Sequence, residues 1–185
     1  MSAGDHPGLT IVDHPGIRTR LTRLRERTTP PPEFRRALHE ISQLMAFELT
    51  RDLETLPTEI ETPLERTAGE KPARPLVLVP VLRAGLGMLQ GFLDIFPEAL
   101  VGHIGMFRNE QTLEPESYYR KLPPRLDQAD VILIDPMLAT GGSGAEALSQ
   151  LVNEGATRLR FLCLISAPEG IAHLRETHPE VPVYT

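Results

Sequence analysis

The chain has 185 residues, of which 41% are hydrophobic and 24% charged, and its formal net charge is −6 at pH 7. These values are ordinary for a globular protein and allow one domain with a proper core. The acidic balance disfavours a general grip on nucleic acid, and no apolar run approaches the roughly 20 residues of a membrane span. The first residues lack the charged and apolar regions of a signal peptide, which predicts a cytoplasmic location.

The first 74 residues predict an arm, two helices and a projecting strand or hairpin. Residues 1–16, with their glycines and two His-Pro pairs, predict a loose arm. Ile17–Arg27 predicts a short helix with one apolar edge, and Phe34–Leu53 a longer amphipathic one. Leu56–Leu64 contains prolines and predicts an edge strand or hairpin arm. Thr67–Pro75 is polar and predicts a loop.

An apolar run, Pro75–Leu82, is typical of a central parallel strand, and a helix is predicted after it from Leu86. Arg83-Ala84-Gly85 follows the strand, at the edge where open α/β sheets bind ligands. A lone arginine here is consistent with a surface charge, but the small residues beside it let the backbone approach a ligand closely. Arg83 is therefore a candidate binding residue.

The next strand is predicted at Leu100–Phe107, and Arg108 ends it. Residues 109–124 are polar and rich in proline, and a loop of this length in a compact domain is either functional or disordered. The functional interpretation is a lid over a reacting centre, with Arg108 at its root. Tyr118 and Tyr119 either contact the ligand from this lid or pack the closed loop, and the sequence leaves both open.

The stretch Val131–Ser143, VILIDPMLATGGS, predicts a buried strand, a tight polar turn and the start of a helix. The helix is predicted over Gly144–Val152, and Gly155 closes it. The free amides of a helix start form an anion site, and adjacent glycines let a phosphate approach. Asp135 ends the strand, where it can accept hydrogen bonds from sugar hydroxyls. The combination suggests a phosphorylated ribose, although a simple turn stays open.

Three familiar glycine motifs do not fit this stretch. A phosphate-binding Walker loop needs Gly-Lys, and no Lys follows Gly142 or Gly144. Ala145 stands where a nucleophile elbow needs its second glycine. The spacing after Gly142 also lacks the third glycine of a dinucleotide fingerprint.

The remaining chain continues the alternation of strands and helices. Arg158–Ala167 predicts a strand, Pro168 opens a short helix, and Val181–Tyr184 predicts the last strand. Cys163 lies within the first of these apolar runs and is expected in the core. Such alternation predicts an α/β fold: a parallel sheet with helices on both faces, preceded by N-terminal helices and a β-arm. We expect residues 17–185 to form one domain, with 17–74 as helices and arm and 75–185 as the binding core.

DPMLATGGS resembles the phosphoribosyl-diphosphate (PRPP) signature of uracil phosphoribosyltransferases. VPVLRAGLGM, GMFRNEQTLEP and SAPEGIAHL occur in that family's order and spacing, and most type I phosphoribosyltransferases have two adjacent acids where this chain has Asp-Pro. The resemblance implies the type I fold, transfer of ribose 5-phosphate from PRPP to uracil, and a homo-oligomer. It implies magnesium carried by PRPP, without protein ligands, and a cis peptide near Arg83-Ala84. The implied substrate-binding residues are Arg83, Arg108, Asp135, Pro136, Met137, Leu138, Ala139, Thr140, Gly141, Gly142 and Ser143.

The resemblance leaves several points open. The family continues into a glycine-rich segment that holds the pyrimidine, whereas this sequence stops at Thr185. Either the working protein is longer, or the chain binds PRPP without efficient uracil turnover; no uracil-binding or catalytic residue is assigned. A related branch binds messenger RNA, for which the arginines of residues 18–27 could supply a basic face. GTP activates some relatives, but no site for it can be read here.

Overall fold

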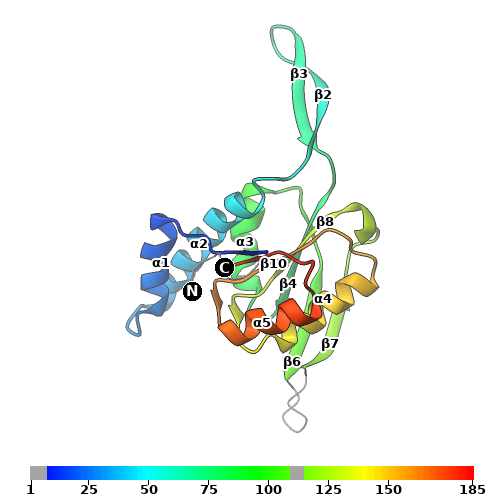
Figure 1. The fold of residues 1–185 in the computed structure, drawn as a ribbon. Coiled ribbons are helices and arrows are strands. Elements are labelled where there is room, and N and C mark those ends of the chain that lie inside the picture. The colour runs from blue at the N-terminus through cyan, green and yellow to red at the C-terminus, as the bar shows by residue number, and fades with distance from the viewer. Residues whose placement is uncertain (1–7, 109–114) are drawn as a thin grey trace.

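The computed structural model describes residues 8–108 and 115–185. Its centre is an eight-stranded sheet of mixed direction, parallel except for one edge strand (Figure 1). In spatial order its strands are β1 (Leu9–Thr10), β12 (Val183–Tyr184), β10 (Leu159–Leu162), β8 (Asp130–Ile134), β4 (Leu76–Leu82), β6 (His103–Arg108) and β7 (Pro115–Lys121), with β5 (Leu100–Val101) paired to β4. This α/β architecture confirms the predicted fold class.

Helices cover both faces of the sheet because its strands are apolar on both faces. One core packs β-strand side chains against α4 and α5, through residues such as Leu148 and Ile171. The other packs the opposite face against α1, α2 and α3, through residues such as Ile41 and Met88. The helices are α1 (Pro15–Arg25), α2 (Pro31–Leu49), α3 (Leu86–Ile95), α4 (Gly142–Asn153) and α5 (Pro168–Thr177), with a 3₁₀ turn at Leu126–Gln128.

The strands and helices of the core lie where the sequence predicts them, with ends that differ by one or two residues; α4, for example, is longer at both ends than the predicted Gly144–Val152. Strand β4 is the apolar run expected to be central, and β8 is the strand of the glycine-rich stretch. The segment Leu100–Phe107 is divided into β5 and β6, and the segment Arg158–Ala167 into β10 and β11 (Ile165–Ser166). Cys163 is fully buried, as expected.

Residues 8–16 do not form part of the loose arm that the sequence predicts for residues 1–16. Leu9–Thr10 pair with β12 at the sheet edge, and backbone hydrogen bonds there give an order that composition does not reveal. Helix α1 begins at Pro15, where the His14 ring accepts a hydrogen bond from a backbone amide. Residues 1–7 lie outside the part of the chain that the structure describes.

The two N-terminal helices are shifted toward the N-terminus from their predicted bounds. The prediction Ile17–Arg27 corresponds to α1, and Phe34–Leu53 to α2. Both helices carry proline in their first turn, where its missing amide is harmless and its fixed φ suits a helix. The apolar periodicity alone placed the starts too late, because prolines do not contribute to it.

Two segments predicted as loops contain strands. β3 (Arg66–Pro72) lies in the predicted loop Thr67–Pro75 and pairs antiparallel with β2 (Thr55–Glu61). β7 lies in the predicted loop of residues 109–124 and pairs antiparallel with β6. Both strands are held by backbone pairing and expose most of their side chains, so they carry no apolar alternation. Residues 109–114 lie outside the described chain.

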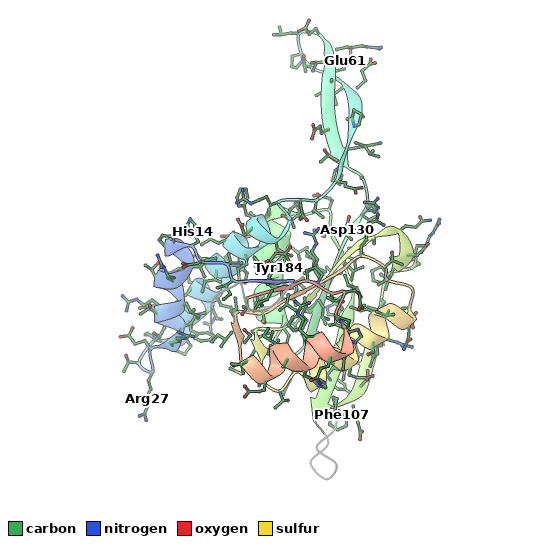
Figure 2. The ribbon with its side chains drawn as sticks, viewed as in Figure 1. His14, Arg27, Glu61, Phe107, Asp130 and Tyr184 are labelled. Atoms are coloured by element: carbon green, nitrogen blue, oxygen red, sulfur yellow. The ribbon has the colours of Figure 1, made fainter. Side chains whose placement is uncertain are left out.

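The β2–β3 hairpin projects away from the body, and its tip is marked by Glu61 in Figure 2. It leaves on the side of the sheet where Asp130 begins β8 (Figure 2). Phe107, near the end of β6, lies at the opposite edge (Figure 2). The hairpin and the carboxyl ends of the parallel strands therefore lie at opposite ends of the molecule.

Candidate functional site

Three neighbouring strands end at the carboxyl edge of the sheet and bring the candidate residues together. β4 lies between β8 and β6, with Pro80 paired to Ile134 and Leu82 paired to Gly105. Arg83 therefore follows the middle strand, and Asp135 follows its neighbour on one side. Arg108 ends the strand on the other side, but its side chain lies outside what the structure describes.

The loop after β4 packs directly onto the end of β8. A Cβ added to Gly85 would lie 2.5 Å from the carbonyl oxygen of Ile134, so only glycine fits this close approach. The peptide bond between Leu82 and Arg83 is cis, one bond before the position expected. The Arg83 side chain is exposed at this edge, where a ligand can reach it.

Helix α4 begins without a side-chain cap. Gly141 adopts φ +88°, a left-handed conformation that favours glycine, and turns the chain into the helix. The first intrahelical hydrogen bond runs from the Ala145 amide to the Gly141 carbonyl at 2.8 Å. The amides of Gly142, Ser143 and Gly144 therefore precede the helical ladder and are available to an anion. The first turn contains no acidic residue that would compete for them.

The segment between Asp135 and helix α4 is fixed by contacts with the segment between β10 and α5. β9 (Met137–Leu138) pairs with β11, and the Ala167 amide donates to the Leu138 carbonyl at 2.8 Å. The Pro136 carbonyl accepts hydrogen bonds from the amides of Leu164 and Ile165, where the chain enters β11. Leu138 is buried in the core, whereas the Met137 side chain is 59% exposed. These candidates thus hold the loop in place through packing and backbone contacts.

Burial raises the pKa of the Asp135 carboxyl to about 6, and a hydrogen bond from the Met137 amide at 3.5 Å partly opposes that shift. Its own amide donates to the Leu162 carbonyl at 3.0 Å, which fixes the backbone at the end of β8. A half-buried carboxylate with remaining acceptor capacity is suited to hydroxyl donors. Asp135 is therefore a candidate residue for recognising the hydroxyl groups of a sugar.

The structure places further residues beside Arg83, of which the sequence singled out only Tyr118, as a residue that either contacts the ligand or packs the loop. A hollow beside Arg83 is lined by Leu82, Met106, Phe107 and Tyr118 as well. Pro115, at the start of β7, lies 3.8 Å from a Cβ placed on Gly142. The sequence signal for these residues was weak, because the β7 segment is polar and is predicted as a loop until its pairing with β6 is known.

Gln150 of α4 connects the helix to the β6–β7 ribbon. Its Nε2 donates to Glu146 at 3.0 Å, and its Oε1 accepts from the Ser117 hydroxyl at 3.5 Å. Farther along β7, Arg120 pairs with Glu154 at 3.1 Å. These contacts hold the ribbon against the helix whose first turn is the candidate anion site.

Within residues 8–108 and 115–185, no group of three or more His, Cys, Asp or Glu side chains is placed to hold a metal ion. Across the same residues, no helix combines the length and hydrophobicity needed to cross a membrane.

Comparison with solved structures defines the class of protein. The chain resembles the AQ2163 protein from Aquifex aeolicus, with a TM-score of 0.90 and 33% identity, covering 95% of this chain and 85% of that one. In fold alone it resembles a purine phosphoribosyltransferase from Pyrococcus horikoshii, with a TM-score of 0.55 and 16% identity, covering 80% of each chain. The fold is that of the type I phosphoribosyltransferases.

The family is specified by sequence. Residues 11–185 match the family model for uracil phosphoribosyltransferase. Uracil phosphoribosyltransferases from Dictyoglomus turgidum and Dictyoglomus thermophilum are 50% and 51% identical to this chain over 176 residues, which is 95% of this chain and 85% of each relative. The chain belongs to the uracil phosphoribosyltransferase family.

Proposed function

We propose that the carboxyl edge of β8, β4 and β6 binds PRPP and that the protein transfers its ribose 5-phosphate to uracil. The products are uridine monophosphate (UMP) and pyrophosphate, which makes this a pyrimidine salvage enzyme. The observation that carries the proposal is the uncapped, acid-free start of α4 beside Asp135, within a chain of this family. A helix start suits the 5′-phosphate of a phosphorylated ribose, and a carboxylate at the strand end suits its hydroxyl groups.

In this mechanism the bond from ribose C1′ to pyrophosphate breaks and a bond from C1′ to uracil N1 forms. The amides of Gly142 and Ser143 hold the 5′-phosphate, a remote anchor whose binding energy positions C1′. Asp135 orients the ribose hydroxyls and its negative charge favours the cation that develops on the ring. Arg83, exposed beside this carboxylate, stabilises the departing pyrophosphate.

Magnesium fits this site as a substrate-borne ion. Among the described residues the site offers Asp135 rather than a cluster of acids, and magnesium commonly keeps its waters and binds substrate phosphates with one or two carboxylates. When bound, the ion neutralises charge on the diphosphate. A GTP effector stays a prediction of the family resemblance, since no residue of this chain is assigned to it.

The arginines of α1 do not favour the RNA-binding alternative. Arg18 pairs with Asp13 at 3.3 Å, and Arg20 pairs with Glu40 at 2.5 Å. Arg23 also pairs with an acid of the same helical segment. Acidic partners therefore neutralise much of the face that RNA would need to contact.

The β2–β3 hairpin is the segment we propose as a subunit contact. A two-stranded ribbon is marginally stable by itself, and this one exposes Leu56, Ile60 and Leu64, the last 95% exposed. A second copy of the chain that covers these side chains would form a dimer. Light scattering should give a dimer mass for the wild type and a smaller mass for Leu64→Asp; a monomeric wild type would contradict the contact.

The function is tested by UMP formation from radiolabelled uracil, PRPP and magnesium. We expect wild-type protein to form UMP, and Arg83→Ala to reduce kcat/KM by roughly 100-fold or more, the usual cost of losing one such donor. Arg66→Ala, on the distant hairpin, is the matched control and should leave the rate unchanged. Absence of UMP with the wild-type protein, at saturating substrates, would overturn the proposal.

A further inference from the structure

Tyr118 occupies an irregular position in the β6–β7 ribbon. Gly105 pairs with Tyr119 and the next residue of β6, Met106, pairs with Ser117, so Tyr118 is the extra residue of a β-bulge. A bulge frees one side chain from the regular alternation of a strand and re-aims it, and bulges are common beside active sites. The structure thus presents one tyrosine of the ribbon outside the normal ladder.

The ring of Tyr118 is held over Gly105. A Cβ placed on Gly105 would lie 2.6 Å from Tyr118 Cζ, so the ring occupies the space that any other side chain would fill. Gly105 is also the backbone partner of Leu82, the residue immediately before Arg83. The bulged tyrosine is therefore positioned beside the loop that follows β4.

The tyrosine and the arginine face a shared hollow. Its lining is Leu82, Arg83, Met106, Phe107 and Tyr118. The Phe107 ring lies 6.3 Å from the Tyr118 ring at an interplanar angle of 50°, which supports the tyrosine from the side. Tyr118 nevertheless remains 54% exposed, so its packing on Gly105 and Phe107 leaves much of the residue accessible to a ligand. The hollow joins one permanent cation, one phenol donor and apolar walls, a combination suited to an anionic group.

We propose that the Tyr118 hydroxyl donates a hydrogen bond to the diphosphate group of PRPP and to product pyrophosphate, beside Arg83. This inference rests on the proposed function and adds a binding residue to it. It also separates two roles of the site: the ribose 5-phosphate end is held by α4, and the diphosphate end by the hollow. Tyr119 has no such role, because it does not line the hollow.

Calorimetry with two probes tests the assignment. Magnesium pyrophosphate reports on the hollow, and ribose 5-phosphate reports on the start of α4. Tyr118→Phe keeps the ring on Gly105 and removes only the hydroxyl, so we expect its Kd for magnesium pyrophosphate to rise about tenfold and its Kd for ribose 5-phosphate to stay unchanged. Tyr119→Phe is the matched control on the same strand and should change neither constant.

A second variant tests the geometry. Gly105→Ala places a methyl group where the ring lies and should displace Tyr118, so it should weaken pyrophosphate binding in the same selective way. The inference is overturned if Tyr118→Phe binds magnesium pyrophosphate like the wild type, if it weakens both probes equally, or if Tyr119→Phe has the same effect. If the wild-type protein binds neither probe, the proposed function fails, and the inference fails with it.

Discussion

Helices α4 and α5 begin side by side, yet their first turns are built differently. Each follows a short strand, β9 or β11, and these two strands pair with each other. α5 has Pro168 in its first turn, which removes one unpaired amide, and Glu169, which complements the helix dipole. α4 has neither, and the amides of Gly142, Ser143 and Gly144 precede its first intrahelical hydrogen bond. The α5 start is complemented by its own residues, whereas the α4 start is the one that we propose binds the 5′-phosphate.

The two helix starts are also in contact with each other. A Cβ placed on Gly170 of α5 would lie 2.4 Å from the carbonyl oxygen of Ala139, so α5 supports the back of the α4 loop. The α5 start is a structural support for the α4 start. The α4 start thus combines an open helix terminus with a neighbour that fixes the loop before it.

The largest expected effect comes from giving α4 the acid that α5 already has. Ser143→Asp places a negative charge beside the proposed 5′-phosphate, and like charges at about 4 Å near a protein surface repel by roughly 3–4 kcal/mol. We expect the Kd for PRPP to rise by roughly 100-fold or more. The free energy of unfolding should hold or increase, because an acid complements the helix start.

The control for this experiment is the helix that already carries an acid. Glu169→Gln removes the charge from the α5 start and should leave PRPP affinity unchanged. Calorimetry measures the PRPP Kd of each variant, and urea unfolding measures the free energy of unfolding of each. Equal PRPP affinity in Ser143→Asp and wild type would show that the two helix starts do not differ in function.

A smaller effect is expected at Asp135, the acid beside the α4 start. Asp135→Asn removes a charged acceptor for the ribose hydroxyls, and such a hydrogen bond contributes about 1.5–3 kcal/mol, so kcat/KM should fall by about 10- to 100-fold. Asp130→Asn is the matched control, because Asp130 begins the same strand at the opposite edge (Figure 2). Steady-state kinetics of the Asp135 variant that match the wild type would rule out the assigned role.

The smallest effect is a pH dependence of stability. The pKa of Asp135 is about 6 in the folded protein and 3.8 in its ordinary state, so between these values the folded state binds more protons than the unfolded state. Stability therefore falls as pH rises through this window, and the loss is complete above the folded pKa. At pH 7 it should amount to about 1–2 kcal/mol, because solvent screens part of the cost at a half-buried carboxylate.

Urea unfolding of the wild type and Asp135→Asn across this pH range checks the sign. The variant cannot ionise, so its advantage in unfolding free energy should grow from near zero at low pH to its full value at pH 7. Curves that stay parallel across the window would contradict the burial of this carboxylate. An activity loss together with a stability gain would mark Asp135 as a functional rather than a structural residue.

The central part of the fold was predictable because its strands are buried and its turns carry specific residues. The apolar run before Arg83 and the run before Asp135 both became central strands. Gly155, predicted to end the α4 helix, adopts φ +91° just beyond it. In these segments hydrophobic pattern and local conformation indicate the same structure, so each position could be read without tertiary information.

The edges of the structure were not predictable in the same way. β1, β3 and β7 are held by backbone pairing. β1 pairs with a strand that is distant in the sequence, and β3 and β7 have few apolar residues, so composition does not reveal any of the three. The same limit applies to the site. Arg83, Asp135 and the α4 start came from motifs, whereas the hollow depends on a bulge that places Tyr118 over Gly105. No local pattern in the sequence specifies that register.

The most direct test of this account is a crystal of the wild-type protein soaked with PRPP and magnesium. We expect density for the 5′-phosphate at the amides of Gly142, Ser143 and Gly144, with the ribose hydroxyls at Asp135. PRPP bound with its 5′-phosphate elsewhere, or no density at saturating concentration, would contradict the claim that the open start of α4 is the phosphate site.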